Sequence, residues 1–339
     1  MEEIKMFTTK TTFKEIREVK ELAPVFPYLI WSMQPGGHED IKDENSLEDV
    51  QVKNPTWQAS DMVYGLNRLL KIAREEGEYL FDVYSVEERK EDSGKEHVKL
   101  IYFPAQGSQR FIILAAGGGY GAVCSLAEAF PVAARLNELG IPVFCLNYRI
   151  GGPALFPKPM DDLAAAYRFI RNHAETFKVD PGTYAVGGFS AGGHLAAAWG
   201  TKELGFWKYQ LPAPEVLLLD YPMIVLWRTV RQLPEPYQKM MLQGYFGEQY
   251  SEEQASPYNI DENIDADYPS VYLIQAEDDP IVPFWNAQDM VKDLKEYQIP
   301  YCFEHPVSGG HGYGLGSGTK AEGWIERAAG YWNSLTLER

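Results

Sequence analysis

Short apolar runs alternate with amphipathic stretches over the C-terminal two thirds of the chain. The runs lack polar alternation, which predicts strands buried on both faces of a parallel sheet. The stretches between them repeat apolar residues at helical spacing, which predicts helices that pack on that sheet. This alternation is typical of a doubly wound α/β domain. The predicted strands are 111–116, 142–146, 184–187, 216–219 and 271–275, and the predicted helices are 125–139, 161–173, 191–199 and 286–297.

The N-terminal third has a more mixed pattern. Apolar residues recur at helical spacing over residues 62–73, after Ser60 and Asp61 and before Gly77. Ser60 and Asp61 are candidate caps and the glycine is a candidate stop, so this pattern predicts one helix. Residues 36–56 are mostly polar and predict a long loop.

Two further strands are predicted just before the doubly wound part. Residues 79–84 and 97–103 are apolar enough for strands, and the charged segment 87–95 between them suits the turn of an antiparallel hairpin at the sheet's edge. No internal repeat or low-complexity linker divides the sequence. We therefore predict a helical extension over residues 1–78 that packs on the core, and an α/β domain over residues 79–339.

Composition and charge narrow the choice of partners. The 339 residues are 45% hydrophobic and 23% charged, as in ordinary globular proteins. The formal charge of −17 opposes binding to nucleic acids and to anionic lipid headgroups, because both depend on clustered cations. We therefore expect neither nucleic acid nor a membrane as partner, and a homodimer is the assembly to test.

The cysteines and the N-terminus point to the cytoplasm. Cys124, Cys145 and Cys302 are odd in number and have apolar neighbours, which fits reduced, buried thiols better than a disulfide framework. Residues 1–20 mix charges throughout and lack the apolar core of a secretion signal. A cytoplasmic location is the expectation.

Ser190 is the candidate nucleophile. It stands in the sequence Gly188-Phe189-Ser190-Ala191-Gly192, between a predicted strand and a predicted helix, which is the context of a nucleophile elbow. In such a tight turn, any side chain at the two glycine positions would collide with neighbouring backbone. The turn therefore predicts that Ser190 lies exposed at the N-terminus of the helix.

A glycine-rich segment after the first predicted core strand supplies candidate oxyanion donors. In Gly117-Gly118-Gly119-Tyr120, the amides of Gly118 and Gly119 can join that of Ala191 in an oxyanion hole. The same segment, with Gly117, Gly119 and Ala122, also matches the fingerprint of a dinucleotide site. That site requires a carboxylate at the end of the next strand, which here ends Leu146-Asn147-Tyr148-Arg149. We expect no cofactor.

The general base is sought among six histidines. In the nucleophile-elbow fold the serine, the acid and the histidine follow in that order, which leaves His305 and His311. His311 lies in a glycine-rich loop that can reach across the carboxyl edge of the sheet, whereas His305 lies too close to the strand before it. His194, one turn into the nucleophile helix, is expected in the core. His38 has no spaced partner, so we expect no metal.

The acid lies among three consecutive carboxylates. Glu277, Asp278 and Asp279 directly follow the predicted strand 271–275, where the fold places the triad acid. The residues themselves do not separate these three candidates.

Four ordered motifs carry a resemblance to a known family. From about Tyr79 to Trp332 the chain resembles the bacterial esterase/lipase-like α/β-hydrolases that are grouped with acetyl xylan esterases and other small carboxylesterases. The resemblance implies an α/β-hydrolase fold, a serine esterase and Asp279 as the acid. In hormone-sensitive-lipase-like esterases a histidine precedes the three glycines, where this chain has Ala116. The motifs are Gly117-Gly118-Gly119-Tyr120, Gly188-Phe189-Ser190-Ala191-Gly192-Gly193-His194, Asp279-Pro280-Ile281-Val282-Pro283 and Gly309-Gly310-His311-Gly312, with Asn147-Tyr148-Arg149 between the first two.

An insertion over about residues 225–268 is predicted to form a small cap above the active site. Tyr120, Met241 and Tyr245 are candidate walls of a substrate pocket, with simple packing inside the cap as the alternative for Met241 and Tyr245. The predicted substrate is a small carboxylic ester, and the family resemblance suggests an acetylated sugar. A serine peptidase of the same fold and a non-catalytic binding protein are the alternative functions.

Overall fold

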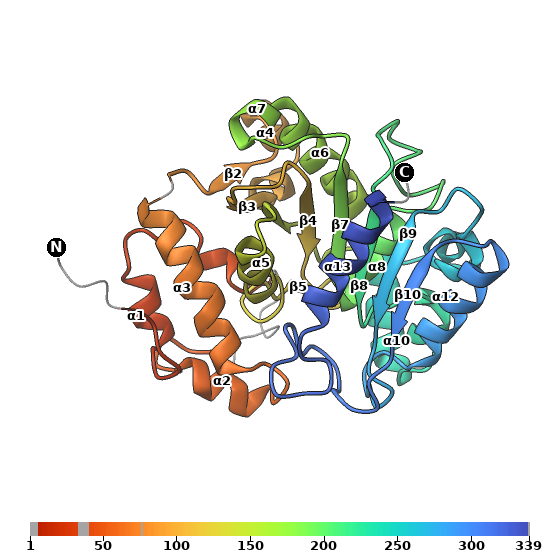
Figure 1. Ribbon diagram of the computed structural model, residues 1–339. Coiled ribbons are helices and arrows are strands. Elements are labelled where there is room, and N and C mark those ends of the chain that lie inside the picture. Colours follow the sequence, from red (N-terminus) through yellow and green to blue (C-terminus); the bar gives the residue numbers. More distant parts are fainter. Residues whose placement is uncertain (1–5, 33–40, 76, 338–339) are drawn as a thin grey trace.

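The computed structural model describes residues 6–32, 41–75 and 77–337 (Figure 1). Its centre is an eight-stranded sheet of order β10-β9-β8-β7-β4-β6-β3-β2. Neighbouring strands from β10 to β6 are parallel, whereas β3 pairs antiparallel with both β6 and β2. This is the mostly parallel, doubly wound sheet of an α/β-hydrolase. The strands are β2 (Leu80–Asp82), β3 (Lys99–Phe103), β4 (Phe111–Ala115), β6 (Val143–Asn147), β7 (Tyr184–Phe189), β8 (Val216–Asp220), β9 (Ser270–Ile274) and β10 (Tyr301–Glu304).

Helices cover the sheet. The four central strands β4, β6, β7 and β8 are buried along their whole length, as expected for strands with helices on both faces. Helices α5 and α13 contact each other in front of the sheet (Figure 1), and α6 contacts α8. The helices of this domain are α4 (Val86–Glu91), α5 (Ala129–Glu138), α6 (Lys158–Asn172), α7 (Ala174–Phe177), α8 (Ser190–Ala198), α9 (Leu226–Val230), α10 (Glu235–Phe246), α11 (Glu252–Ala255), α12 (Trp285–Glu296) and α13 (Trp324–Leu337).

The predicted edge hairpin is present, but its connection differs from the prediction. Strands β2 and β3 pair antiparallel at the end of the sheet. The charged segment between them forms α4 and a 3-10 helix, Ser93–His97, instead of a simple turn. The reason is a capping box, in which the Ser85 hydroxyl accepts from the Glu88 N–H and the Glu88 carboxylate accepts from the Ser85 N–H.

The predicted long loop over residues 36–56 is wrong in its second half. Helix α2 (Leu47–Lys53) begins after Ser46, whose side chain and that of Asp49 form another capping box. The predicted helix that follows is present as α3 (Ala59–Glu75). Its start is earlier than expected, so Ser60 lies inside the first turn instead of capping it. His38 and its acidic neighbours lie outside the described residues.

The N-terminal helices pack on one flank of the sheet. Figure 1 shows α1 (Phe13–Arg17), α2 and α3 together beside α5. The apolar face of α3 is buried, and the Arg68 Nε of α3 donates to the Asn137 Oδ1 of α5 at 2.6 Å. A short strand, β1 (Trp31–Ser32), pairs with β5 (Ala122–Val123) just after the glycine-rich loop. The extension therefore shares the hydrophobic core of the main domain.

The segment between β8 and β9 is mostly helical. It holds α9, α10 and α11 and two 3-10 helices, Ser256–Tyr258 and Asp261–Asn263, and it corresponds to the predicted cap. None of the helices in the described ranges combines the length and the apolar character that a membrane span needs.

Candidate active site

Ser190 lies at the sharp turn from β7 into α8. Its φ of 52° is unusual for a residue with a side chain and is typical of the strained nucleophile elbow. A Cβ atom at Gly192 would lie 2.1 Å from the Ala115 carbonyl oxygen, and one at Gly188 would lie 2.1 Å from the Gly192 carbonyl oxygen. Both distances are far below van der Waals contact, so the turn requires glycine on each side of the serine.

His311 lies between Ser190 and Asp279. Its Nε2 is 2.9 Å from the Ser190 Oγ, and its Nδ1 is 2.7 Å from the Asp279 Oδ2. Because an ionised carboxylate only accepts, Nδ1 carries the proton and Nε2 is free to accept from the serine hydroxyl. The Asp279 Oδ1 accepts the N–H groups of Ile281 and Val282, each at 2.9 Å, which fixes the buried carboxylate.

The three consecutive acids make three different contacts. The Asp278 Oδ1 accepts the N–H groups of Gly309 and Gly310, each at 2.9 Å. Asp278 therefore holds the start of the loop after β10 that carries His311, called the histidine loop below. Glu277 pairs with His305 at 2.8 Å on the surface. Of the two late histidines, His311 contacts the serine and His305 contacts this outer acid.

The glycine-rich loop leaves two amides free beside the serine. The carbonyls of Gly117 and Gly118 accept from the N–H groups of Cys124, Gly121 and Ala122. The N–H groups of Gly118 and Gly119 have no acceptor within the described ranges. Ala191 is the second residue of α8, in the first turn, where amides have no intrahelical acceptor. These three amides are the donors that the sequence predicts for an oxyanion hole.

Tyr120 and Tyr245 hold this loop, and their predicted place in the cavity wall is wrong. The Tyr120 hydroxyl is 2.7 Å from the His194 Nδ1, and the Tyr245 hydroxyl donates to the Gly119 carbonyl at 3.1 Å. Both side chains are buried and absent from the cavity lining. His194 also donates from Nε2 to the Tyr258 carbonyl at 2.9 Å. Burial lowers its pKa to about 4, so it serves as a neutral core residue, as expected.

The dinucleotide alternative fails on local structure. A dinucleotide fingerprint requires the glycine-rich turn to open directly into a helix. Here the turn continues into β5, which pairs with β1, and α5 begins only at Ala129. Among the described residues no group of three His, Cys, Asp or Glu side chains is placed to hold a metal.

A mostly apolar cavity of about 710 Å³ opens above the serine. Met241 of α10 lines it, with Thr229, Val230 and Leu233 from the same cap segment, and its contact with substrate stays a prediction. Residues 53–57 of the N-terminal extension form another part of the wall. The sequence analysis missed this contribution, because a loop far from the catalytic motifs carries no local sign of its tertiary position.

Comparison with known proteins identifies the family. The model of the family described as BD-FAE matches residues 100–294, more than half of the chain. The chain belongs to the BD-FAE family. The BD-FAE match includes Ser190 and Asp279, whereas residues 53–57 and His311 lie outside it.

Relatives of this BD-FAE chain include enzymes named for acetyl esters. An acetylxylan esterase from Xylanibacter ruminicola is 28% identical over 253 residues, which are 71% of this chain and 48% of that protein. An ethyl acetate hydrolase from Pseudomonas putida is 33% identical over 107 residues, 31% of this chain and 33% of that protein. The chain thus spans about half or less of the length of these curated relatives.

A solved structure gives the same fold. The crystal structure of an acetyl ester-xyloside bifunctional hydrolase from Caldicellulosiruptor lactoaceticus matches with a TM-score of 0.60 and 27% identity. The match covers 70% of this chain and 88% of that chain.

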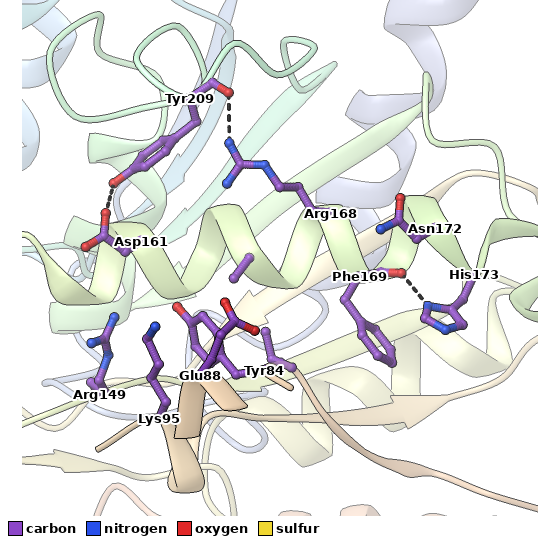
Figure 2. Close-up of a pocket in the computed structure, with 12 residues that line it drawn as sticks. Tyr84, Glu88, Lys95, Arg149, Asp161, Arg168, Phe169, Asn172, His173 and Tyr209 are labelled. Carbon is purple, nitrogen blue, oxygen red and sulfur yellow. Dashed lines mark hydrogen bonds between the residues drawn. The ribbon is translucent and has the colours of Figure 1, made fainter. Parts of the chain in front are cut away.

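A second depression of the BD-FAE chain, about 450 Å³, lies along α6 (Figure 2). Two of its polar lining residues, Arg149 and Tyr209, bind acidic side chains. Arg149 contacts Asp162 and Asp92, each at 2.7 Å, and the Tyr209 hydroxyl donates to Asp161 at 2.7 Å. We assign this network a structural role, because it holds the loop after β6 against α6.

Proposed function

We propose that the protein is a serine carboxylic-ester hydrolase that works through an acyl-enzyme. The observation that carries the proposal is the chain of hydrogen bonds from Asp279 through His311 to Ser190. Ser190 and His311 line the same cavity as Gly118 and Gly119, whose amides have no acceptor among the residues that the structure describes. A nucleophile with its base and preformed oxyanion donors are the parts that acyl transfer requires.

Acylation follows from the geometry. The His311 Nε2 accepts the proton of the Ser190 hydroxyl while Oγ attacks the ester carbonyl carbon. The amides of Gly118, Gly119 and Ala191 donate to the oxyanion of the tetrahedral intermediate. The imidazolium then gives its proton to the leaving alcohol as the C–O bond breaks, and the acyl group stays on Oγ.

Deacylation repeats these steps with water. Neutral His311 takes a proton from a water molecule, which attacks the acyl carbonyl, and the imidazolium returns the proton to Ser190 as the acid leaves. Asp279 keeps the imidazole in the required tautomer and stabilises its charged form in both halves of the reaction. Two backbone N–H donors hold its side chain in place.

We propose a small carboxylic ester as substrate, with an acetylated sugar as the first candidate. The names of the acetylxylan esterase and ethyl acetate hydrolase relatives support an acetyl group. The cavity is larger than an acetyl group needs, and its apolar lining gives room for part of the alcohol as well.

We also propose that the protein works in the reducing cytoplasm. Cys124, Cys145 and Cys302 form no disulfide with one another in the described part of the chain. Burial raises the pKa of the Cys124 and Cys145 thiols well above the usual range, so neither is a reactive thiolate.

The test is a hydrolysis panel. We expect turnover of p-nitrophenyl acetate and acetylated xylo-oligosaccharides by the wild type, and loss of turnover in Ser190→Ala. Aminoacyl-anilides are expected to stay intact. Cleavage of anilides faster than esters would point to a peptidase, and no turnover of either class would contradict a hydrolase.

A further inference from the structure

One buried carboxylate beside the serine has no part in the steps above. Glu128 precedes the first residue of α5 and lines the cavity together with Ser190 and His311. Its side chain is buried, and burial raises its pKa to about 7. A buried acid is costly unless its oxygens are hydrogen bonded, so its contacts indicate why the site contains it.

The first contact of Glu128 is with the glycine-rich loop 117–120, which contains the proposed oxyanion donors and is called the oxyanion loop below. Its Oε2 accepts the N–H of Gly117 at 2.5 Å. Gly117 directly precedes the two free amides, and a Cβ atom there would lie 2.8 Å from the Ser190 Cβ. The backbone that Glu128 holds is therefore packed against the nucleophile. At the preceding residue, the Ala116 carbonyl accepts from the Tyr148 hydroxyl at 2.7 Å.

The second contact leads to the histidine loop. The Tyr221 hydroxyl donates to the Glu128 Oε1 at 3.1 Å and accepts the N–H of Gly314 at 3.2 Å. The ring of Tyr221 lies against the imidazole of His311, with 4.7 Å between the centroids. One carboxylate thus connects the oxyanion loop with the loop that carries the base.

The histidine loop also rests on the backbone next to Glu128. Gly314 has a φ of 56°, and a Cβ atom there would lie 2.4 Å from the Ala127 carbonyl oxygen. The loop after His311 can approach the start of α5 this closely only with glycine at this position. The Glu128 side chain and its neighbouring backbone therefore support the same loop.

We propose that Glu128 is a positioning residue, which fixes the free amides of the oxyanion loop relative to His311 through Gly117 and Tyr221. The proposal rests on the proposed hydrolase function. In hormone-sensitive-lipase-like esterases a histidine precedes the three glycines, and this sequence has Ala116 there. Glu128 supports the loop at the next residue, Gly117.

The first test compares two substitutions of Glu128. In Glu128→Ala the Gly117 N–H loses its acceptor, and we expect kcat on p-nitrophenyl acetate to fall about 10- to 100-fold, somewhat less than the loss of an oxyanion donor itself costs. KM should change little, because the amides act mainly in the transition state. Glu128→Gln keeps an oxygen for Gly117 and should retain most of kcat.

Fluorophosphonate labelling of Ser190 gives a second readout that does not depend on the choice of ester. We expect the labelling rate to follow kcat across the wild type, Glu128→Gln and Glu128→Ala. Glu215→Ala is the matched control, because Glu215 is a buried acid that binds Arg110 and Trp332 at the opposite end of β8. It should lower the unfolding temperature without slowing the labelling of folded protein.

A Tyr221→Phe variant tests the second contact of Glu128, the one that leads through Tyr221 to the histidine loop. If Glu128 acts through Tyr221, the losses in Glu128→Ala and Tyr221→Phe will not multiply in the double variant. Wild-type kcat and labelling rate in folded Glu128→Ala, or a Gln variant as slow as the Ala variant, would overturn the positioning role. Wild-type protein that neither hydrolyses esters nor labels would instead refute the proposed function itself.

Discussion

At the scale of single residues, hydrogen-bond partners separate side chains that the sequence leaves equivalent. Glu277, Asp278 and Asp279 follow one another after β9, yet only Asp279 contacts the imidazole of His311. Asp278 accepts two backbone N–H groups of the histidine loop, and Glu277 pairs with His305. The family resemblance selects Asp279 from a motif, whereas the geometry gives each acid a distinct contact.

The different contacts of Asp278 and Asp279 predict that substituting one or the other has unequal effects on activity. Asp279→Asn should lower kcat by about 10⁴-fold, because an amide at this position stabilises the wrong tautomer of the imidazole. Asp278→Asn should retain most activity, since its side-chain oxygen can still accept from Gly309 and Gly310. Steady-state kinetics on p-nitrophenyl acetate measures both, and the reverse ranking would transfer the role of the acid to Asp278.

Glu128 also predicts a pH dependence of stability. Burial raises its pKa from the usual 4.5 to about 7, so between these values the folded protein keeps a proton that the unfolded chain has released. Stability should therefore fall as pH rises through this window, by up to about 1.4 kcal/mol per pH unit.

Urea unfolding of the wild type and Glu128→Gln from pH 5 to 8 isolates this effect. The unfolding free energy of Glu128→Gln minus that of the wild type should grow with pH until the carboxyl is ionised near pH 7. A difference that stays constant over this range would show that the Glu128 carboxyl is not perturbed in the folded state.

At the scale of elements, the sequence predicts the helices and strands that a local residue pattern encodes. The central strands, the nucleophile helix and the edge hairpin follow from apolar periodicity, and the glycines of the elbow follow from steric demand. Helix α2 is missed because its apolar face is only two side chains, Leu47 and Val50. The loop-holding roles of Tyr120 and Tyr245 are missed because the contacts join segments far apart in the chain.

The wall that the N-terminal extension adds to the cavity predicts an effect on substrate selectivity. Trp57 lines the cavity, and its Nε1 would lie 3.2 Å from a Cβ atom at Gly312 in the histidine loop. Trp57→Ala should widen the cavity, and kcat/KM for bulky esters relative to small ones should rise about 10-fold. The ratio of kcat/KM for bulky and small esters is measured instead of kcat/KM for a single ester, because Trp57→Ala can also shift the histidine loop and so change the rate with every ester.

Selectivity is measured with a p-nitrophenyl acyl series and an alkyl acetate series. Val52→Ala is the control, because Val52 lies on the adjacent helix α2 and is 80% exposed. Unchanged ratios in both series for Trp57→Ala would show that the extension does not shape the substrate site.

At the scale of the whole molecule, the active site joins segments from most of the chain. The proposed nucleophile Ser190 follows β7, the glycine-rich loop follows β4, the proposed acid Asp279 follows β9 and the proposed base His311 follows β10, so the carboxyl ends of parallel strands meet at one edge of the sheet. This part of the site is predictable because sheet topology brings those ends together. The hydrogen bond between Glu128 and Tyr221 is not predictable from the sequence, since these residues are 93 positions apart and meet only in the folded chain.

A homodimer stays a prediction at this scale. Light scattering coupled to size-exclusion chromatography gives the mass directly, against 38.4 kDa for one chain. A mass near twice this value is expected for the dimer, and a mass near 38.4 kDa would contradict it.

The central claim is that His311 and Asp279 activate Ser190, and covalent labelling tests it most directly. A fluorophosphonate probe followed by peptide mapping should modify one residue, Ser190, because only an activated serine attacks phosphorus quickly at neutral pH. Labelling should be lost in His311→Ala and kept in His305→Ala. Labelling of a different residue, or loss in His305→Ala with labelling kept in His311→Ala, would contradict the proposed active site.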